Sequence, residues 1–189
     1  MTLSSDPMID LSLRFLLALV FAGAAVSKLQ NRDEFHGVVR NFRLLPRAVD
    51  GAFAFVLPWV ELAIAVALVT GVGLVITSVA AAVLLVMFAV AVAINIVRGR
   101  TEIDCGCFRH GLRQRLSWAL VARNGVLALA ALWISTQPIW SRGFGAYDIV
   151  IGALVASSVL VIYMCATELA AIRRLPIRGR SLANEGWPR

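Results

Sequence analysis

The sequence has little charge, few cysteines and few histidines. Of its 189 residues 15% are charged and 60% are hydrophobic, whereas an ordinary soluble domain has about 25% charged and roughly 45–50% apolar residues. This shortage of charge, combined with long apolar runs, excludes an ordinary soluble domain. The three cysteines are too few for a disulfide-stapled scaffold. A close cysteine pair plus a third thiol instead indicates redox or metal chemistry.

The net charge is +7, which in a soluble protein would indicate nucleic-acid binding. Here the basic residues cluster in the connections between the apolar runs. Basic residues at such positions orient a membrane protein and contact anionic lipid. We therefore expect the lipid bilayer as a partner and no nucleic acid.

Apolar runs of about 20 residues are long enough to span a bilayer as helices, and a backbone in lipid must satisfy its own hydrogen bonds. The glycines of residues 70–73 predict a tight turn between two antiparallel helices. We expect an all-α polytopic bundle with a four-helix core plus one helix, forming a transmembrane domain over residues 1–172 and a basic tail over 173–189. The five predicted helices cover about residues 11–29, 49–70, 74–97, 117–136 and 147–172.

Positive charge is distributed unequally between the two sides of this bundle. Connections 28–47 and 98–116 and the tail after residue 172 each hold five basic residues, whereas the opposite side has only Arg14 and Arg142. Basic connections stay in the cytoplasm. The sequence therefore predicts a multi-pass protein of the inner (plasma) membrane with its N-terminus outside. The C-terminus and the connection with Cys105 and Cys107 are predicted to be cytoplasmic.

Cys105 and Cys107 are separated only by Gly106, in a basic connection between two predicted helices. The thiolate is the reactive form of cysteine, and nearby positive charge lowers the pKa of a thiol. A glycine relieves the backbone strain of a ring closed between residues i and i+2. The pair is thus a candidate dithiol–disulfide centre, with two inert structural cysteines as the alternative. Cys165 is either a third thiol that resolves a mixed disulfide or a small buried helix residue.

A zinc site is the alternative for the same cysteines. Cys105, Cys107 and His110 have the spacing C-x-C-x-x-H, and His36 lies in another connection on the same side. Thiolates and imidazoles are zinc's usual ligands in tetrahedral sites. The four residues could therefore complete such a site.

Glu61 lies near the middle of the predicted helix 49–70. A carboxylate at that depth costs roughly 2.5–3.5 kcal/mol on insertion scales, so it needs a partner. Arg123 and Asn124, inside the helix 117–136, are its predicted partners. The pair is either structural or part of a polar cavity or proton path. Asn95 and Lys28, near the cytoplasmic helix ends, are expected to make helix-end contacts or to snorkel.

Several motifs together resemble the MauE-like membrane proteins, which are named for methylamine utilisation and are related to the DoxX-like group. The resemblance covers roughly residues 11–135 and departs at Arg109, where the family usually has glycine. The matching segments are 27–29 (SKL), 41–46 (NFRLLP), 58–62 (PWVEL), 95–100 (NIVRGR), 103–108 (IDCGCF) and 123–124 (RN).

The resemblance implies thiol–disulfide work in the maturation of a disulfide-rich periplasmic enzyme subunit, beside a thioredoxin-like partner. The periplasmic role that the resemblance implies conflicts with the cytoplasmic position predicted for the thiols. Three explanations remain open: a relay from a cytoplasmic donor, a cysteine connection reached from within the bundle, or the reverse orientation. The favoured function is a membrane thiol–disulfide redox protein acting through Cys105 and Cys107. A quinone cofactor is conceivable by analogy with other membrane thiol oxidoreductases, although no residue specifies it. The alternatives are a non-catalytic subunit or assembly factor that contacts other membrane subunits, and a small-molecule transporter.

Overall fold

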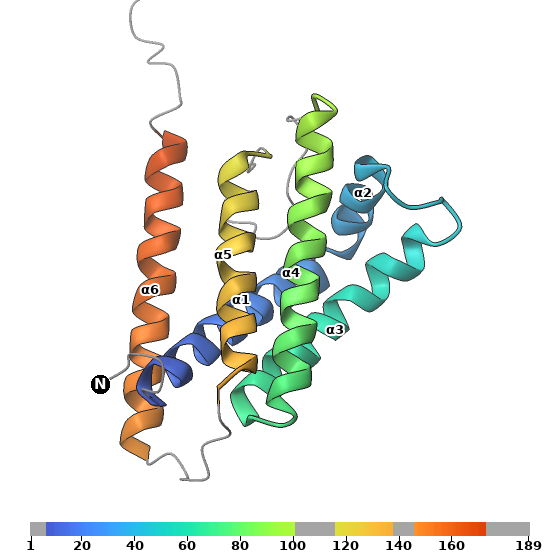
Figure 1. The fold of residues 1–189 in the computed structure, drawn as a ribbon. Helices are drawn as coiled ribbons and strands as arrows, with labels where there is room; N and C mark the ends of the chain where they lie inside the picture. The colour runs from blue at the N-terminus through green and yellow to red at the C-terminus, as the bar shows by residue number, and fades with distance from the viewer. Residues whose placement is uncertain (1–6, 101–115, 138–145, 173–189) are drawn as a thin grey trace, which may run out of the picture.

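The computed structural model describes residues 7–100, 116–137 and 146–172. These residues form helices and connections, with no strand among them. Figure 1 shows the arrangement of the helices. The six helices are α1 (Pro7–Gln30), α2 (Arg32–Phe42), α3 (Asp50–Thr70), α4 (Leu74–Val97), α5 (Trp118–Ser135) and α6 (Ala146–Ile172).

The five predicted membrane helices correspond to α1, α3, α4, α5 and α6, and the all-α class is confirmed. Their bounds follow from apolar composition and from the turn residues that interrupt it. Gly71 and Gly73, between α3 and α4, have φ values of 77° and 56°. Only glycine adopts this left-handed region without a Cβ penalty, so the predicted turn is confirmed.

The amphipathic helix α2 was missed, because its eleven residues were assigned to a basic connection. Its apolar side chains recur at i, i+3, i+4 and i+7 (Phe35, Val38, Val39 and Phe42), which is the pattern of a helix with one buried face. Phe35 is buried on this face. The helix ends at Arg43, which has a left-handed φ of 48° and donates its N–H to the carbonyl of Arg40.

The core is built by four helices, as predicted, with α6 added outside. Small and branched side chains of α1, α3, α4 and α5 interdigitate, with Leu17, Leu68, Ala81 and Ala131 fully buried. Helix α4 runs along α5, and α1 runs beside α3, both at a steep tilt to α4 (Figure 1). Helix α6 packs on α1, where a Cβ at Gly152 would lie 3.1 Å from Leu11.

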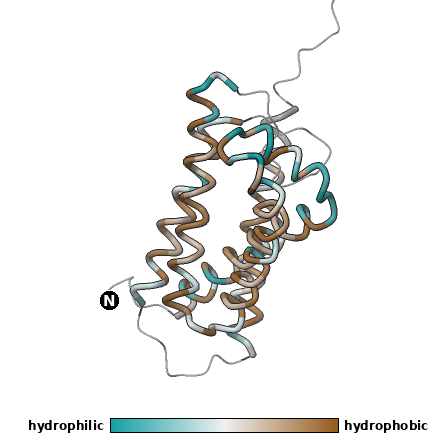
Figure 2. Tube along the Cα trace, turned by 90° about the vertical axis from the view of Figure 1, so that its right-hand side faces the viewer, coloured by the Kyte–Doolittle hydropathy of each residue, from teal (hydrophilic) through white to brown (hydrophobic). Residues whose placement is uncertain are grey.

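The outer surface of the bundle is apolar. Within the described residues, α1, α3, α4 and α5 are each long and apolar enough to cross a membrane, and α6 contains a shorter apolar stretch, Tyr147–Ile162. Branched side chains such as Val83, Val126 and Leu129 are more than 60% exposed. Figure 2 shows hydrophobic residues along the helices and hydrophilic ones mainly near their ends. A water-soluble protein would not present such a surface, so the chain is a multi-pass membrane protein.

The helices alternate in direction, which brings several helix termini to one end of the bundle (Figure 1). We call this end the basic end; it is formed by the C-terminus of α4, the N-termini of α3 and α5, and helix α2. The described residues there include Arg32, Arg40, Arg43, Arg47, Arg98 and Arg100. The inequality of charge expected from the sequence is therefore present in the fold.

Candidate functional site

A buried ion pair joins α1 to α3 below the basic end. The Nζ of Lys28 lies 2.5 Å from Oε1 and 2.8 Å from Oε2 of Glu61. Each side chain is 1% exposed. Because one ammonium donates to both oxygens, the carboxylate and the amine are neutralised as a unit within the apolar bundle.

Two aromatic rings face the same ammonium. The Nζ of Lys28 is 5.4 Å from the ring centroid of Phe35, on α2, and 5.1 Å from that of Phe88, on α4. A cation over an aromatic face within about 6 Å is attracted by the ring quadrupole, by up to about 2 kcal/mol when desolvated. The cluster therefore connects four helices through one amine.

The pairing corrects two expectations. Arg123 was predicted as the partner of Glu61 and Lys28 was expected to snorkel, but Lys28 is buried and bonds Glu61. Lys28 lies two residues before the end of α1, whereas Glu61 lies eleven residues into α3, or roughly 17 Å along that helix. For parallel upright helices these depths would not match. Helices α1 and α3 are instead both tilted, and the C-terminal end of α1 lies beside the middle of α3 (Figure 1), which brings the two residues together.

The remaining predicted polar residues are buried in α4 and α5. Asn95 is fully buried and donates to the carbonyl of Ala91 at 3.0 Å, while its own Oδ1 accepts no hydrogen bond. Asn124 is 3% exposed, and its Oδ1 accepts from Nη2 of Arg123 at 3.4 Å. Both amides are thus buried inside apolar helices.

His36 lies at the junction of α2 and α3, where its contact is with a carboxylate. Its Nε2 is 3.4 Å from Oδ1 of Asp50, and Nε of Arg40 is 3.9 Å from Oδ2 of the same carboxylate. No cluster of three or more potential ligands occurs among the residues that the structure describes. Cys105, Cys107 and His110, the other residues of the zinc alternative and of the redox pair, lie outside the described residues.

Cys165 lies on the outer surface of α6. It is a free, exposed cysteine, which corrects the alternative of a small buried helix residue. Helix α6 contacts the bundle through α1. The thiol is thus accessible from outside the helix bundle.

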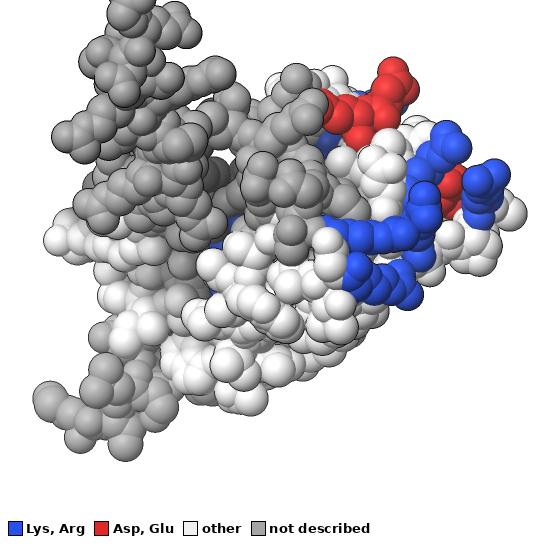
Figure 3. Space-filling view, turned by 90° about the horizontal axis from the view of Figure 1, so that it is seen from above, with Lys and Arg blue, Asp and Glu red and all other residues white. Residues whose placement is uncertain are grey.

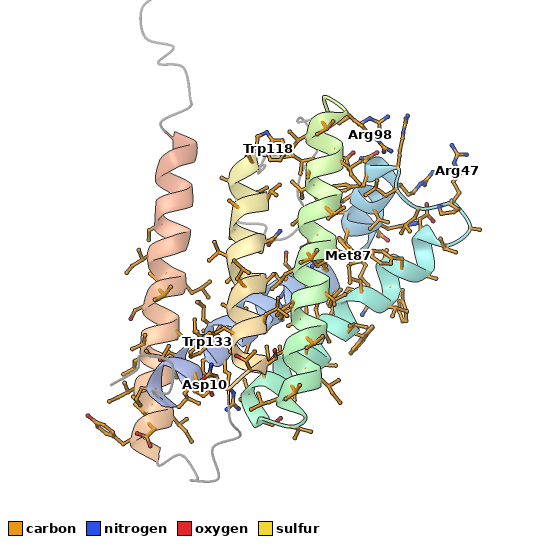
Figure 4. All side chains as sticks on the ribbon, in the orientation of Figure 1. Asp10, Arg47, Met87, Arg98, Trp118 and Trp133 are labelled. Carbon is orange, nitrogen blue, oxygen red and sulfur yellow. The ribbon has the colours of Figure 1, made fainter. Side chains whose placement is uncertain are left out.

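A second polar cluster lies at the opposite end of the bundle, where Figure 4 labels Asp10. Arg14 donates from Nε and Nη2 to the carbonyl of Leu68, at 3.2 and 3.1 Å, and its Nη1 is 3.8 Å from Asp10. The carbonyls in the last turn of a helix lack intrahelical donors. Arg14 therefore satisfies the end of α3 and has a structural task, which sequence reasoning did not assign.

Comparison with known proteins places these observations in a family. Residues 6–137 match the family described as methylamine utilisation protein MauE. No solved structure matches the chain.

Curated relatives of the same description align over most of both chains. The protein from Paracoccus versutus is 47% identical over 179 residues, covering 95% of each chain. That from Methylorubrum extorquens is 44% identical, covering 92% of this chain and 93% of the relative. That from Paracoccus denitrificans is 48% identical, covering 88% and 90%. With its tilted helix bundle and the motifs around Lys28, Glu61 and Asn124 inside the matched region, the chain belongs to the MauE family.

Proposed function

We propose that the protein is a membrane component of methylamine utilisation that performs thiol–disulfide exchange through Cys105 and Cys107. The family and the description shared by its relatives, methylamine utilisation proteins, support the process. The cysteine pair supports the chemistry, because a C-x-C dithiol can form and release a disulfide. A thioredoxin-like protein is the partner that this chemistry fits.

The observation that carries the proposal is the position of the two helix ends that the cysteine connection joins. It joins the end of α4 to the start of α5, two helices that pack along their length. Both anchoring helix ends lie at the basic end of the bundle. Since the connection begins and ends at these helix termini, we expect a water-soluble partner to reach its dithiol from this side of the membrane.

The exchange is balanced between the two proteins. The thiolate of one cysteine attacks a sulfur of the partner's disulfide and forms a mixed disulfide, and the second cysteine then attacks this bond. Cys105 and Cys107 become a disulfide, and the partner receives two electrons and two protons as a dithiol. The reverse sequence reduces the pair.

The buried ion pair has a structural role in this proposal. Both carboxylate oxygens of Glu61 are engaged by Lys28, so the pair holds α1 on α3 and does not offer an open acid for transport. We assign Lys28 and Glu61 the task of fixing the bundle on which the cysteine connection is mounted.

The charge distribution supports a cytoplasmic basic end in the plasma membrane. Six arginines of the described residues lie there, and cytoplasmic ends are enriched in arginine and lysine. In this orientation Cys105 and Cys107 exchange with a partner on the cytoplasmic side.

Thiol trapping in intact cells tests the proposal. Membrane-permeant and impermeant maleimides are applied before and after reduction to the natural protein and to Cys105→Ser, Cys107→Ser and Cys165→Ser variants. In the natural protein we expect Cys105 and Cys107 to label only after reduction. One of the variants Cys105→Ser and Cys107→Ser should trap a mixed disulfide with the partner, and both variants should lose growth on methylamine. Cys165→Ser decides whether a third thiol is required.

Free labelling of Cys105 and Cys107 without reduction, with growth preserved in both variants, would contradict the exchange. Loss of folding and of bound zinc in the same variants would instead establish the structural metal site.

A further inference from the structure

A cavity of about 160 Å³ lies between α2, α3, α4 and α5. Its inner wall contains the buried residues Leu57, Val92 and Asn124, and its outer wall contains Leu44, Leu45 and Met87, each at least 36% exposed. The cavity therefore opens to the outside of the bundle. Its remaining lining is Phe35, Val38, Val39, Phe42, Phe53, Phe88 and Ala91.

The lining suits a hydrocarbon. Twelve of its thirteen residues have apolar side chains, and Asn124 is the exception. Apolar cavities of about 150 Å³ stay dry and take up apolar guests. In a membrane protein, the hydrocarbon available at an outward opening is an acyl chain of lipid.

The basic residues near the opening suit an anionic headgroup. Arg43 lies between the lining residues Phe42 and Leu44, and Arg98 caps the end of α4. Figure 4 shows Arg98 and Arg47 on the side of the bundle where Met87 also lies, and Figure 3 shows lysine and arginine side chains gathered on this end.

Several of these arginines have no acidic partner among the described residues. Within the part of the chain that the structure describes, Arg43, Arg47, Arg98 and Arg100 pair with no carboxylate, whereas Asp50 is already approached by His36 and Arg40. Arginine binds phosphate oxygens through several N–H donors. A phosphate above the cavity would provide the missing negative charge.

We propose that this cavity and its arginines form a binding site for an anionic phospholipid. The phosphate lies against Arg43 and Arg98, and the upper part of one acyl chain enters the cavity between α2 and α4. The site adds lipid selectivity to a membrane protein and does not depend on the proposed thiol exchange. Since Phe35 and Phe88 line the cavity and also face Lys28, a bound chain would pack against the cluster that holds the bundle.

The test measures lipid retention by native mass spectrometry of the full chain, purified in detergent with equal amounts of phosphatidylglycerol and phosphatidylcholine. We expect the natural protein to retain phosphatidylglycerol selectively. The double variant Arg43→Gln/Arg98→Gln should bind it roughly thirtyfold more weakly, since two basic residues near a membrane surface contribute about 1 kcal/mol each. The variant Ala91→Phe, which fills the cavity, should no longer retain phosphatidylglycerol, although all its arginines are present.

Arg32→Gln is the matched control, because Arg32 is exposed at the opposite end of α2 from Arg43. It removes one positive charge, as the single variant Arg43→Gln does, and unlike that variant it should leave selective retention nearly unchanged. Equal retention of both lipids by the natural protein, or the same loss in Arg32→Gln as in the double variant, would overturn the site in favour of diffuse surface charge.

Crosslinking keeps the proposal testable if Ala91→Phe does not fold. Phosphatidylglycerol with a photoreactive group in its acyl chain should label the lining of the natural protein, with Met87 among the labelled residues. Labels confined to α6 or to the outer face of α5 would overturn the proposal, as would equal labelling of the lining by a quinone analogue in competition with the lipid.

Discussion

At the scale of single residues, the Lys28–Glu61 pair carries the largest electrostatic consequence. Two charges taken out of water are tolerated because each neutralises the other at 2.5 Å. Removing one partner leaves the other buried and uncompensated, which costs about 3–5 kcal/mol, whereas replacing both by apolar groups is often neutral. The pair is therefore a stringent test of the bundle.

We predict that Lys28→Met lowers the free energy of unfolding by about 3–5 kcal/mol. The double variant Lys28→Met/Glu61→Leu should recover most of this loss, because it removes the unpaired carboxylate. Reversible unfolding in detergent micelles measures both variants. A double variant as unstable as the single one would show that the contacts of the lysine stem, and not its charge, hold α1 on α3.

The turn at Gly71 offers a second residue-scale prediction. Its φ of 77° is unfavourable for any residue with a Cβ, and a Cβ there would lie 2.8 Å from Nη2 of Arg14. We expect Gly71→Ala to destabilise the protein by about 1–2 kcal/mol or more. Gly125→Ala is the matched control, because Gly125 is helical with nothing within 4 Å of the added Cβ.

The comparison is read from the thermal midpoints of the two variants. The Gly125 variant should equal or exceed the natural protein, since alanine favours a helix over glycine by about 1 kcal/mol. Equal midpoints for the two variants would mean that Arg14 and the turn adjust without cost.

At the scale of elements, α2 is held by burial more than by charge. Phe35 is 7% exposed, whereas the His36 and Arg40 side chains that approach Asp50 are 41% and 58% exposed. Exposed ion pairs contribute about 0–1 kcal/mol, and truncation of a buried phenylalanine costs about 3–5 kcal/mol. The apolar face of α2 therefore decides whether the helix stays on the bundle.

We predict that Phe35→Ala speeds trypsin cleavage after Arg40 and Arg43 severalfold, because α2 opens locally more often. Asp50→Asn should change the cleavage rate by less than about twofold. The cleavage products are identified by mass spectrometry. Faster cleavage in Asp50→Asn than in Phe35→Ala would reverse the assignment and make the ion pairs the main restraint on α2.

At the scale of the whole molecule, the orientation is the central prediction. We expect the basic end in the cytoplasm and the turn between α3 and α4 outside. In a background without Cys105, Cys107 and Cys165, single cysteines at Val72 and Leu45 test this with an impermeant maleimide on intact cells. Val72→Cys should label at once, because Val72 is 69% exposed, and Leu45→Cys only after lysis. The opposite pattern would reverse the orientation and place the cysteine connection outside.

The sequence predicts the bounds of the helices better than it predicts the contacts between them. The bounds of α4 match those expected from the apolar run, and the turn at residues 70–73 follows from its glycines. Helix α2 was missed, although the spacing of Phe35, Val38, Val39 and Phe42 was a signal for it. The burial of Glu61 and Asn124 follows from their place inside apolar helices, whereas Asn95 was expected at a helix end. The partner of Glu61 was not predicted, because the pairing depends on how α1 is tilted and offset along α3.

The sequence by itself determined the membrane class, the number of long helices, the turn between α3 and α4 and the unequal charge of the two ends. These properties follow from local composition, since the bilayer requires about 20 apolar residues per helix and a self-satisfied backbone. Only the tertiary structure decided that Lys28 meets Glu61, that Arg14 satisfies the end of α3, and that α2 closes a cavity with α4. Each of these contacts joins residues distant in sequence, and the way α1 is tilted and offset along α3 decides which of their residues meet.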